Sequence, residues 1–274
     1  MAETRSSPAH PRGFFQTFRK DAWWSYPLFT VIVLGAFGVY SLWAAYTGIA
    51  GAEAFHYLDH GRDYLSPFYS PCITDACAEG PLAGTITGVT VVTPALFVMW
   101  MPLGLRATCY YYRKAYYRAF FASPVACSVD EPRKKYSGEA AFPFVLQNLH
   151  RYFLYLALLF PPFLLYDAWL AFQVNGSFAV TAVALVMLAN ALLLTGFTFG
   201  CHALRHWVGG RLNCFSCSNV AKGRYGLWRG VTWFNKHHGK WAWVSLVWVG
   251  LTDAYIRAVI HFGPSIDPIL FGGA

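Results

Sequence analysis

The sequence predicts an all-α integral membrane protein with five transmembrane helices, its N-terminus cytoplasmic and its C-terminus outside. The chain has 274 residues, of which 56% are hydrophobic and only 12% are charged, and its mean hydropathy is +0.37. A soluble domain carries roughly 25% charged residues, so much of this surface is expected to face lipid. We interpret residues 1–274 as a single transmembrane domain.

Long apolar runs define the expected spans, because about 20 apolar residues in a helix cross roughly 30 Å of hydrocarbon with every backbone group bonded internally. The second run contains Pro94 and Pro102, and the fifth contains Asp253 and Arg257, so these two runs are less regular than the others. Prolines are tolerated in membrane helices where neighbouring groups satisfy the freed carbonyls. The runs lie at 26–49, 85–105, 152–172, 178–201 and 241–262.

The distribution of lysine and arginine sets the expected orientation. Of the 21 basic residues, 4 lie in the N-terminal tail, 8 in residues 106–151 and 7 in residues 205–240. Because cytoplasmic segments are rich in Lys and Arg, we assign segments 1–25, 106–151 and 202–240 to the cytoplasmic side of a multi-pass protein of the inner (plasma) membrane. This orientation accounts for the +8 net charge, so nucleic-acid binding is not needed to explain it.

The N-terminal tail contains Arg12, Arg19 and Lys20 and leads directly into a full-length apolar run. This pattern shows no cleavable signal peptide, and we expect the first helix to be retained.

The first outside loop contains two cysteines, Cys72 and Cys77. Because thiols outside a bacterial membrane tend to oxidise, we expect these two to form a small disulfide loop, with a metal site as the alternative.

An aromatic and basic run, residues 109–121, begins the first large cytoplasmic segment. Tyrosines at the level of the lipid headgroups form the usual interfacial belt, which explains many of them. A surface of this kind is also suited to a peripheral partner subunit, since Tyr and Arg are enriched in interface cores.

The second large cytoplasmic segment contains two pairs of possible metal ligands. Cys214 and Cys217 form a C-x-x-C motif, whose thiolates can reach one metal ion or close a disulfide. His202 and His206 are four residues apart and therefore share one face of a helix. Together the four residues are compatible with a tetrahedral zinc site or with a Rieske-type [2Fe–2S] cluster, in which two Cys hold one iron and two His hold the other.

Other donors on the same side leave the ligand set open. A haem b between His150 and His202 is a competing possibility, but no histidine lies in the middle of a span, which argues against a deeply embedded haem. The alternative donors are His150, His237, His238, Cys109, Cys127 and Cys201.

Asp253 and Arg257 are charged residues within the fifth run. Charge in hydrocarbon is costly, so such residues are candidates for a functional site, although a structural ion pair explains them equally well. They are the one feature that suggests a transporter or channel.

Several motifs resemble a known family. They are residues 114–118, Pro143 with residues 146–152, residues 200–206 with Gly209 and Gly210, and residues 241–250. These resemble the single-chain, five-helix membrane anchors of actinobacterial succinate dehydrogenase (succinate:quinone oxidoreductase, respiratory complex II), over about residues 106–257.

The resemblance implies a role within a complex, with no catalytic activity of the chain alone. Its expected partners are a flavoprotein subunit and an iron–sulfur subunit, and its expected substrate is menaquinone or ubiquinone. The resemblance also implies a Rieske-type [2Fe–2S] cluster, for which spacing favours His202, His206, Cys214 and Cys217. For the quinone we predict an apolar slot with donors from His150, Arg151 and Tyr152. The alternative is a purely structural anchor with zinc or no metal.

Overall fold

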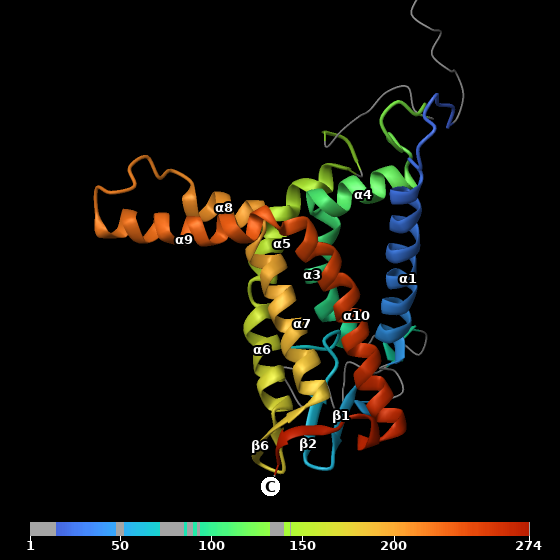
Figure 1. Cartoon of the computed structure of the whole chain (residues 1–274), viewed down its shortest axis with the longest axis vertical. Coiled ribbons are helices and arrows are strands. Elements are labelled where there is room, and N and C mark those ends of the chain that lie inside the picture. Colours follow the sequence, from blue (N-terminus) through green and yellow to red (C-terminus); the bar gives the residue numbers. More distant parts are fainter. Residues whose placement is uncertain are drawn as a thin grey trace, which may run out of the picture. The chain divides into compact units, whose positions relative to one another are not determined.

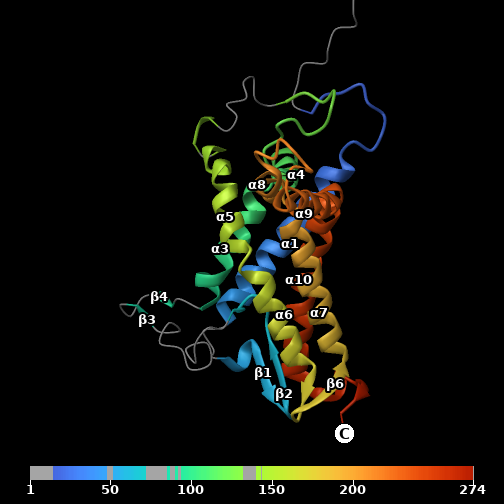
Figure 2. The same ribbon diagram turned by 90° about the vertical axis from the view of Figure 1, so that its left-hand side faces the viewer.

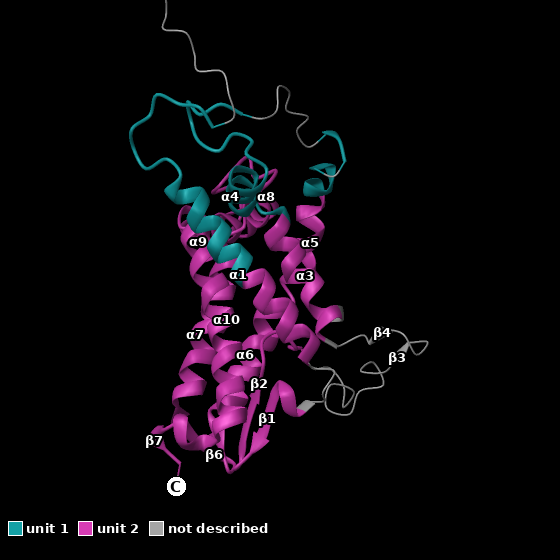
Figure 3. Ribbon diagram, turned by 90° about the vertical axis from the view of Figure 1, so that its right-hand side faces the viewer, with its two compact units in different colours: residues 1–36, 108–148 teal, residues 37–107, 149–274 magenta. Residues whose placement is uncertain are grey.

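A computed structural model describes residues 15–47, 52–71, 85–86, 90–91, 94–131, 140–142 and 144–273. The chain forms two compact units, one comprising Met1–Ala36 with Thr108–Asn148 and the other Phe37–Ala107 with Leu149–Ala274. Figure 3 shows the two units in different colours. The expectation of one domain is not tested by this division. The predicted disulfide between Cys72 and Cys77 lies outside the described residues.

The second unit is a bundle of long helices. Its centre is α7 (Ala182–Phe199), which packs against both α6 (Phe160–Ala171) and α10 (His238–Phe262). The second half of α1 (Ser25–Thr47) and most of α3 (Pro94–Thr108) belong to this unit. At one end of the bundle, α8 (His202–Gly209) and α9 (Asn219–Lys236) form a pair of helices that extends sideways (Figure 1).

A bend divides the third predicted span. The structure has α5 (His150–Ala157) and α6 in its place, preceded by a 3-10 helix, η4 (Phe144–Leu149), and the helical axis bends by 41° at the break. Pro161 and Pro162 lie in the first turn of α6, where their missing N–H groups leave no intrahelical bond unmade. The helix therefore stops and restarts at the prolines.

Among the described helices, three are long and apolar enough to cross a membrane, namely α1, α7 and α10, and a fourth results if the bent α5–α6 pair is one span. The helix in the second predicted span, α3, has 15 described helical residues. The structure thus supports a mostly helical membrane protein, while five spans and the side on which each terminus lies remain predictions.

Short strands close the opposite end of the second unit, which we call the hairpin end (Figure 2). There β1 (His56–Asp59) pairs with β2 (Arg62–Leu65). A second antiparallel sheet contains, in spatial order, β5 (Gln173–Val174), β6 (Ser177–Thr181) and β7 (Ile269–Gly272). The other short elements are η2 (Ala52–Ala54), β3 (Thr85–Ile86), β4 (Thr90–Val91) and η5 (Pro264–Ile266).

Asp267 holds the hairpin end together. Its carboxylate accepts hydrogen bonds from Arg62 Nη1 at 2.7 Å and from Tyr64 Oη at 2.7 Å, and it also accepts from the backbone N–H of Val183 at the start of α7. All three groups satisfy a fully buried carboxylate. Burial, followed by the hydrogen bond to Asp267, raises the pKa of Tyr64 above its ordinary value.

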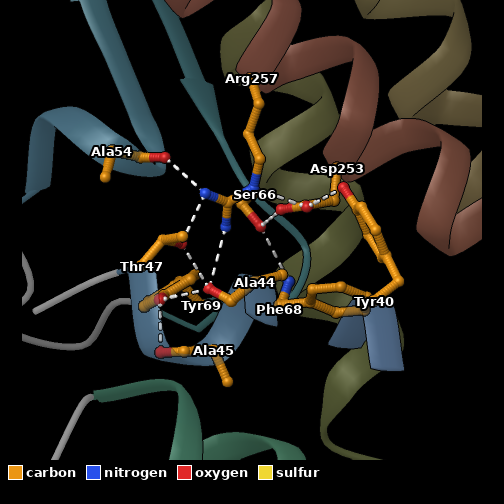
Figure 4. Close-up of polar contacts among 10 residues, drawn as sticks. All are labelled: Tyr40, Ala44, Ala45, Thr47, Ala54, Ser66, Phe68, Tyr69, Asp253 and Arg257. Atoms are coloured by element: carbon orange, nitrogen blue, oxygen red, sulfur yellow. Dashed lines mark hydrogen bonds and ion pairs between the residues drawn. The ribbon is translucent and has the colours of Figure 1, made fainter. Parts of the chain in front are cut away.

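Asp253 and Arg257 form an ion pair, with Arg257 Nε 2.7 Å from Asp253 Oδ2 (Figure 4). Asp253 also accepts hydrogen bonds from Tyr40 and Ser66. The Arg257 guanidinium donates to Thr47 Oγ1 and to the carbonyls of Ala54 and Ala44. These contacts connect α10 to α1 and to the segment around β1 and β2. The structure therefore favours the structural interpretation of this pair, and no transport role is needed to explain it.

In the first unit, α4 (Tyr110–Phe120) has one buried face made by Tyr112, Ala115 and Tyr117. Tyr117 packs edge-on against Phe144 at 4.8 Å between ring centroids. The other side of this helix exposes Tyr110 and Tyr111 to the surroundings.

Candidate cofactor and quinone site

Helix ends from four parts of the second unit contribute to one candidate site. They are the end of α3, the start of α5, the segment that joins α7 to α8, and the start of α10. The side chains involved are Arg106, His150, Cys201 and His238, which lie far apart in the sequence. These helix ends lie at the end of the bundle from which the helix pair α8–α9 extends, opposite the hairpin end (Figure 1).

His150 and Cys201 are direct neighbours, with Nε2 of the imidazole 3.1 Å from Sγ of the thiol. Cys201 is 1% exposed. A bound metal ion is what would favour the thiolate at such a buried position.

His238 occupies the adjacent start of α10 and is almost fully buried. Its ring stacks on Phe197, with 5.0 Å between centroids and 5° between planes. His150 lies near enough to act on it electrostatically. Gly200 is required here, because an added Cβ would lie 2.8 Å from His238 Nδ1. The backbone of Gly200 is held by Asn235, whose Nδ2 donates to its carbonyl at 2.8 Å.

Arg106 places a buried positive charge beside these groups. Its Cζ lies 4.6 Å from the centroid of Phe197. Its guanidinium donates to the Ala242 carbonyl at 3.2 Å and to Ser245 Oγ at 3.0 Å on α10. The charge therefore lies over an aromatic face and is tied to the first turns of α10.

An apolar cavity begins at Arg106 and extends into the bundle. Its volume is about 70 Å³, and Arg106 is the one charged side chain among its described lining residues. The lining comes from α1, the segment after β2, and helices α3, α5, α6, α7 and α10. It includes Phe37, Pro67, Phe68, Met99, Pro102, Leu105, Phe160, Leu164, Leu194, Phe197 and Val249.

The predicted metal ligands lie elsewhere in the second unit. His202 and His206 are exposed on α8. Cys214 and Cys217 lie in the loop between α8 and α9 and are joined to each other as a disulfide. Among the described residues, no three His, Cys, Asp or Glu side chains are arranged to hold one metal ion. The predicted ligand set thus stays a prediction, and the structure does not bring its four members together.

The alternative donors divide between the two units. His150, Cys201 and His238 belong to the site described above, and His237 directs Nδ1 toward the carbonyl of Trp233 at 3.3 Å. Cys109 is buried and Cys127 is exposed, both in the first unit.

Of the residues predicted to bind quinone, His150 is half-buried and contacts Cys201. Arg151 and Tyr152 are exposed on α5, and neither lines the apolar cavity. Sequence reasoning missed Arg106, which lines that cavity. The sequence shows Arg106 as a single arginine at the end of an apolar run. It was counted there among the basic residues that assign a segment to the cytoplasmic side.

The fold and this site define a helical membrane protein in which buried His and Cys donors lie beside an apolar cavity with a single buried cation. The family model for actinobacterial succinate dehydrogenase subunit SdhC matches residues 25–261. The chain therefore belongs to this family of succinate dehydrogenase membrane anchors.

A solved structure agrees with this assignment. The chain is similar to one in the Mycobacterium smegmatis Sdh1 complex in the apo form, with 40% sequence identity and a TM-score of 0.78, and the match covers 93% of this chain and 94% of the other. No curated protein sequence gives a match.

Proposed function

We propose that this chain anchors the peripheral subunits of succinate dehydrogenase to the membrane and provides the cavity in which quinone is reduced. The observation that carries the proposal is the apolar cavity at the buried Arg106, found in a member of a succinate dehydrogenase anchor family. A quinone is a flat apolar ring with two carbonyl oxygens, and it requires an apolar slot with few donors.

The anchoring role is supported by the similarity to a chain of the Sdh1 complex. The partners we propose are a flavoprotein subunit and an iron–sulfur subunit. The exposed side of α4 offers Tyr110, Tyr111 and Lys114, and tyrosine is enriched in the cores of protein interfaces. This surface is the proposed dock for the iron–sulfur subunit.

Arg106 supplies the polar recognition of the quinone. Its guanidinium is held by Ala242 and Ser245 in a fixed orientation. A donor fixed in this way stabilises the negative charge that builds up on a quinone oxygen during reduction. The apolar lining keeps water away from the quinone ring.

We further propose a Rieske-type [2Fe–2S] cluster at this site, with His150 and His238 as the histidine ligands and Cys201 as one cysteine ligand. The donor chemistry fits, since the buried His238 and Cys201 and the half-buried His150 lie at the same end of the bundle, and Cys201 and His150 are already in contact. A cluster of two irons divides its ligands into two pairs, so four donors need not converge on one point. When bound, the cluster supplies a one-electron carrier next to the cavity.

A cluster of this type takes two cysteine ligands. Serine substitution of each other cysteine in turn identifies the second one. The sequence-based ligands Cys214 and Cys217 are expected to be dispensable, because each is already bonded to the other.

The test uses EPR spectra of the dithionite-reduced, purified complex together with its iron content. Cys201→Ser is expected to abolish the signal of a mixed His/Cys cluster, and Cys214→Ser, the matched control, is expected to retain it. Loss of the signal in Cys214→Ser but not in Cys201→Ser would instead support the ligands predicted from sequence spacing, His202, His206, Cys214 and Cys217. Iron-free anchor with full quinone reductase activity would refute the cluster and leave a structural anchor.

The anchoring role has a separate test. Affinity purification of the tagged chain from its native membrane is expected to recover succinate dehydrogenase activity with an artificial acceptor. Recovery of the intact chain without dehydrogenase subunits would contradict the role.

A further inference from the structure

A second, polar cavity lies deeper in the bundle, with Asn190 as its central feature. Asn190 lies eight residues after the start of α7, about 12 Å along the helix axis from its first residue. Its side chain is 2% exposed. Within the described part of the chain, its Oδ1 atom has no hydrogen-bond partner. A buried amide oxygen in this state is costly, and an ordered water is the usual remedy.

The cavity at Asn190 is small and has polar groups on three helices. Asp167 of α6, Asn190 of α7 and Thr252 of α10 line it, together with Leu65, Pro67 and Leu164. Two of these residues, Pro67 and Leu164, also line the apolar cavity proposed for quinone. The polar cavity therefore adjoins the apolar cavity at Pro67 and Leu164.

Polar groups continue from this cavity toward the hairpin end. Asp167 is half-buried and accepts a hydrogen bond from the buried Ser70. Helix α6, which carries Asp167, packs against β2, which carries Asp63. His56 Nε2 lies 2.7 Å from Asp63 Oδ1, and the Asp63 side chain is 38% exposed. The hydrogen-bonded pair His56–Asp63 on β1 and β2 and the pair Ser70–Asp167 at the polar cavity therefore belong to elements that pack together.

We propose that the polar cavity holds an ordered water which, with Asp167, delivers protons from the hairpin end to quinone in the apolar cavity. This inference rests on the proposed function. Reduction of quinone to quinol consumes two electrons and two protons. The electrons come from succinate, whose oxidation to fumarate releases two protons at the peripheral subunits. The two protons that bind the quinone oxygens are taken from the aqueous phase at the hairpin end. The reaction therefore releases protons on the side of the peripheral subunits and consumes protons on the side of the hairpin end.

The direct test reconstitutes the whole complex into liposomes with a pH-sensitive dye in the lumen. Succinate added outside reaches only those complexes whose peripheral subunits face outward. The topology predicted from the Lys and Arg distribution assigns the loop that contains β1 and β2 to the opposite side of the membrane, so in these complexes the hairpin end is expected to face the lumen. Potassium with the ionophore valinomycin prevents a membrane potential from building up and opposing proton uptake. During quinone reduction we expect the pH of the lumen to rise and an uncoupler to abolish the rise. Quinone reduction at full rate with no rise in lumen pH would overturn the inference.

Variants identify the route. Asp167→Asn removes the exchangeable carboxyl, and Asn190→Leu replaces the amide with an apolar group of similar size. Each is expected to lower quinone reduction and lumen alkalinisation together by tenfold or more, a factor typical of lost proton transfer. Asp59→Asn is the matched control, because Asp59 is an exposed acid in β1 that does not line the cavity. Equal rates in all three variants would refute the route.

Two further readouts separate the possible failures. Succinate oxidation with an artificial acceptor at the peripheral subunits must stay at the native rate in each variant, which shows that the complex is assembled. A cryo-EM map of the complex at high resolution is expected to show water density between Asn190 and Asp167, and a dry cavity would contradict the inference. Absence of quinone reduction by the native complex would refute the proposed function itself.

Discussion

His150 Nε2 lies 3.1 Å from Cys201 Sγ, although the two residues are 51 positions apart in the chain. The contact joins the start of α5 to the residue that precedes α8, and His238 of α10 packs beside it. The half-buried imidazole and the buried thiol come from elements that only the packing of the bundle brings together.

Gly200→Ala is expected to displace the His238 ring, because the new Cβ would lie 2.8 Å from Nδ1. Overpacking of this kind costs about 1–3 kcal/mol. The cluster signal in EPR should weaken or disappear, while the chain still assembles. Gly226→Ala on α9 is the control, since nothing lies within 4 Å of the added carbon, and it should keep the native signal. Equal spectra for both variants would contradict this role of Gly200.

Arg106→Leu is expected to reduce succinate:quinone reductase activity and to spare succinate oxidation with an artificial acceptor. Hydrogen bonds to a charged group contribute about 1.5–3 kcal/mol, which corresponds to a loss of roughly 10- to 100-fold in kcat/KM for quinone. Arg205→Leu is the matched control, because Arg205 contacts Thr232 and Trp228 on α9 and does not line the apolar cavity. A native kcat/KM in Arg106→Leu would exclude the cavity as the quinone site.

Arg257→Met is expected to destabilise the chain strongly, because it leaves the fully buried Asp253 carboxylate without its cation. Breaking one side of a buried pair costs about 3–5 kcal/mol. The double variant Arg257→Met with Asp253→Leu should lose less stability than the two single losses added together. Thermal unfolding in detergent measures the cycle, and strict additivity would show that the two residues are not coupled.

Asp267→Asn removes the anion that holds Arg62 while it keeps the side-chain shape. We expect a loss of about 3–5 kcal/mol in the free energy of unfolding, since the Arg62 guanidinium is left buried. Asp59→Asn, an exposed position, should change this free energy by less than about 0.5 kcal/mol. Comparable losses in the two variants would argue against a special role for Asp267.

Tyr64→Phe should alter the dependence of stability on alkaline pH. The folded-state pKa of Tyr64 is raised, mainly by burial and then by its hydrogen bond to Asp267. Above the ordinary tyrosine pKa of about 10 the native state holds a proton that the unfolded state has lost, so stability falls as pH rises through that window. The fall should be shallower in Tyr64→Phe than in the native chain when unfolding is followed between pH 9 and about 12. The exposed Tyr26 provides the control Tyr26→Phe, which should follow the native curve.

Helices with long apolar runs were predictable from the sequence. The fifth predicted span, 241–262, corresponds to α10 at His238–Phe262, and the first, 26–49, overlaps α1 at Ser25–Thr47. In both cases lipid selects the helix, since each backbone group must be bonded within the segment.

Where tertiary contacts decide the local structure, the sequence misled. The fourth span was drawn from residue 178, but residues 177–181 form strand β6 and the helix starts only at Ala182. The hydroxyl oxygen of Thr181 caps that helix by accepting a hydrogen bond from the backbone N–H of Ala184. Strand β6 pairs with β7, which lies far along the chain. No local pattern reveals a partner roughly 90 residues away.

The candidate site shows the same limit. The patterns C-x-x-C and H-x-x-x-H are visible because their members are close in sequence. His150, Cys201 and His238 appeared among the alternative metal donors, and His150 also among the predicted quinone-binding residues, but no pattern in the sequence grouped the three together. Proximity between helix ends is set by packing around Phe197 and Gly200, which spacing does not encode.

The position of Asp267 near the end of the chain also has a consequence for biogenesis. Arg62 emerges from the ribosome about 200 residues before its counter-ion, and the first turn of α7 likewise precedes the carboxylate that caps it. The hairpin end can therefore adopt its final arrangement only after the last helix has been inserted. Until then the early segments carry a cation whose partner has not yet been synthesised.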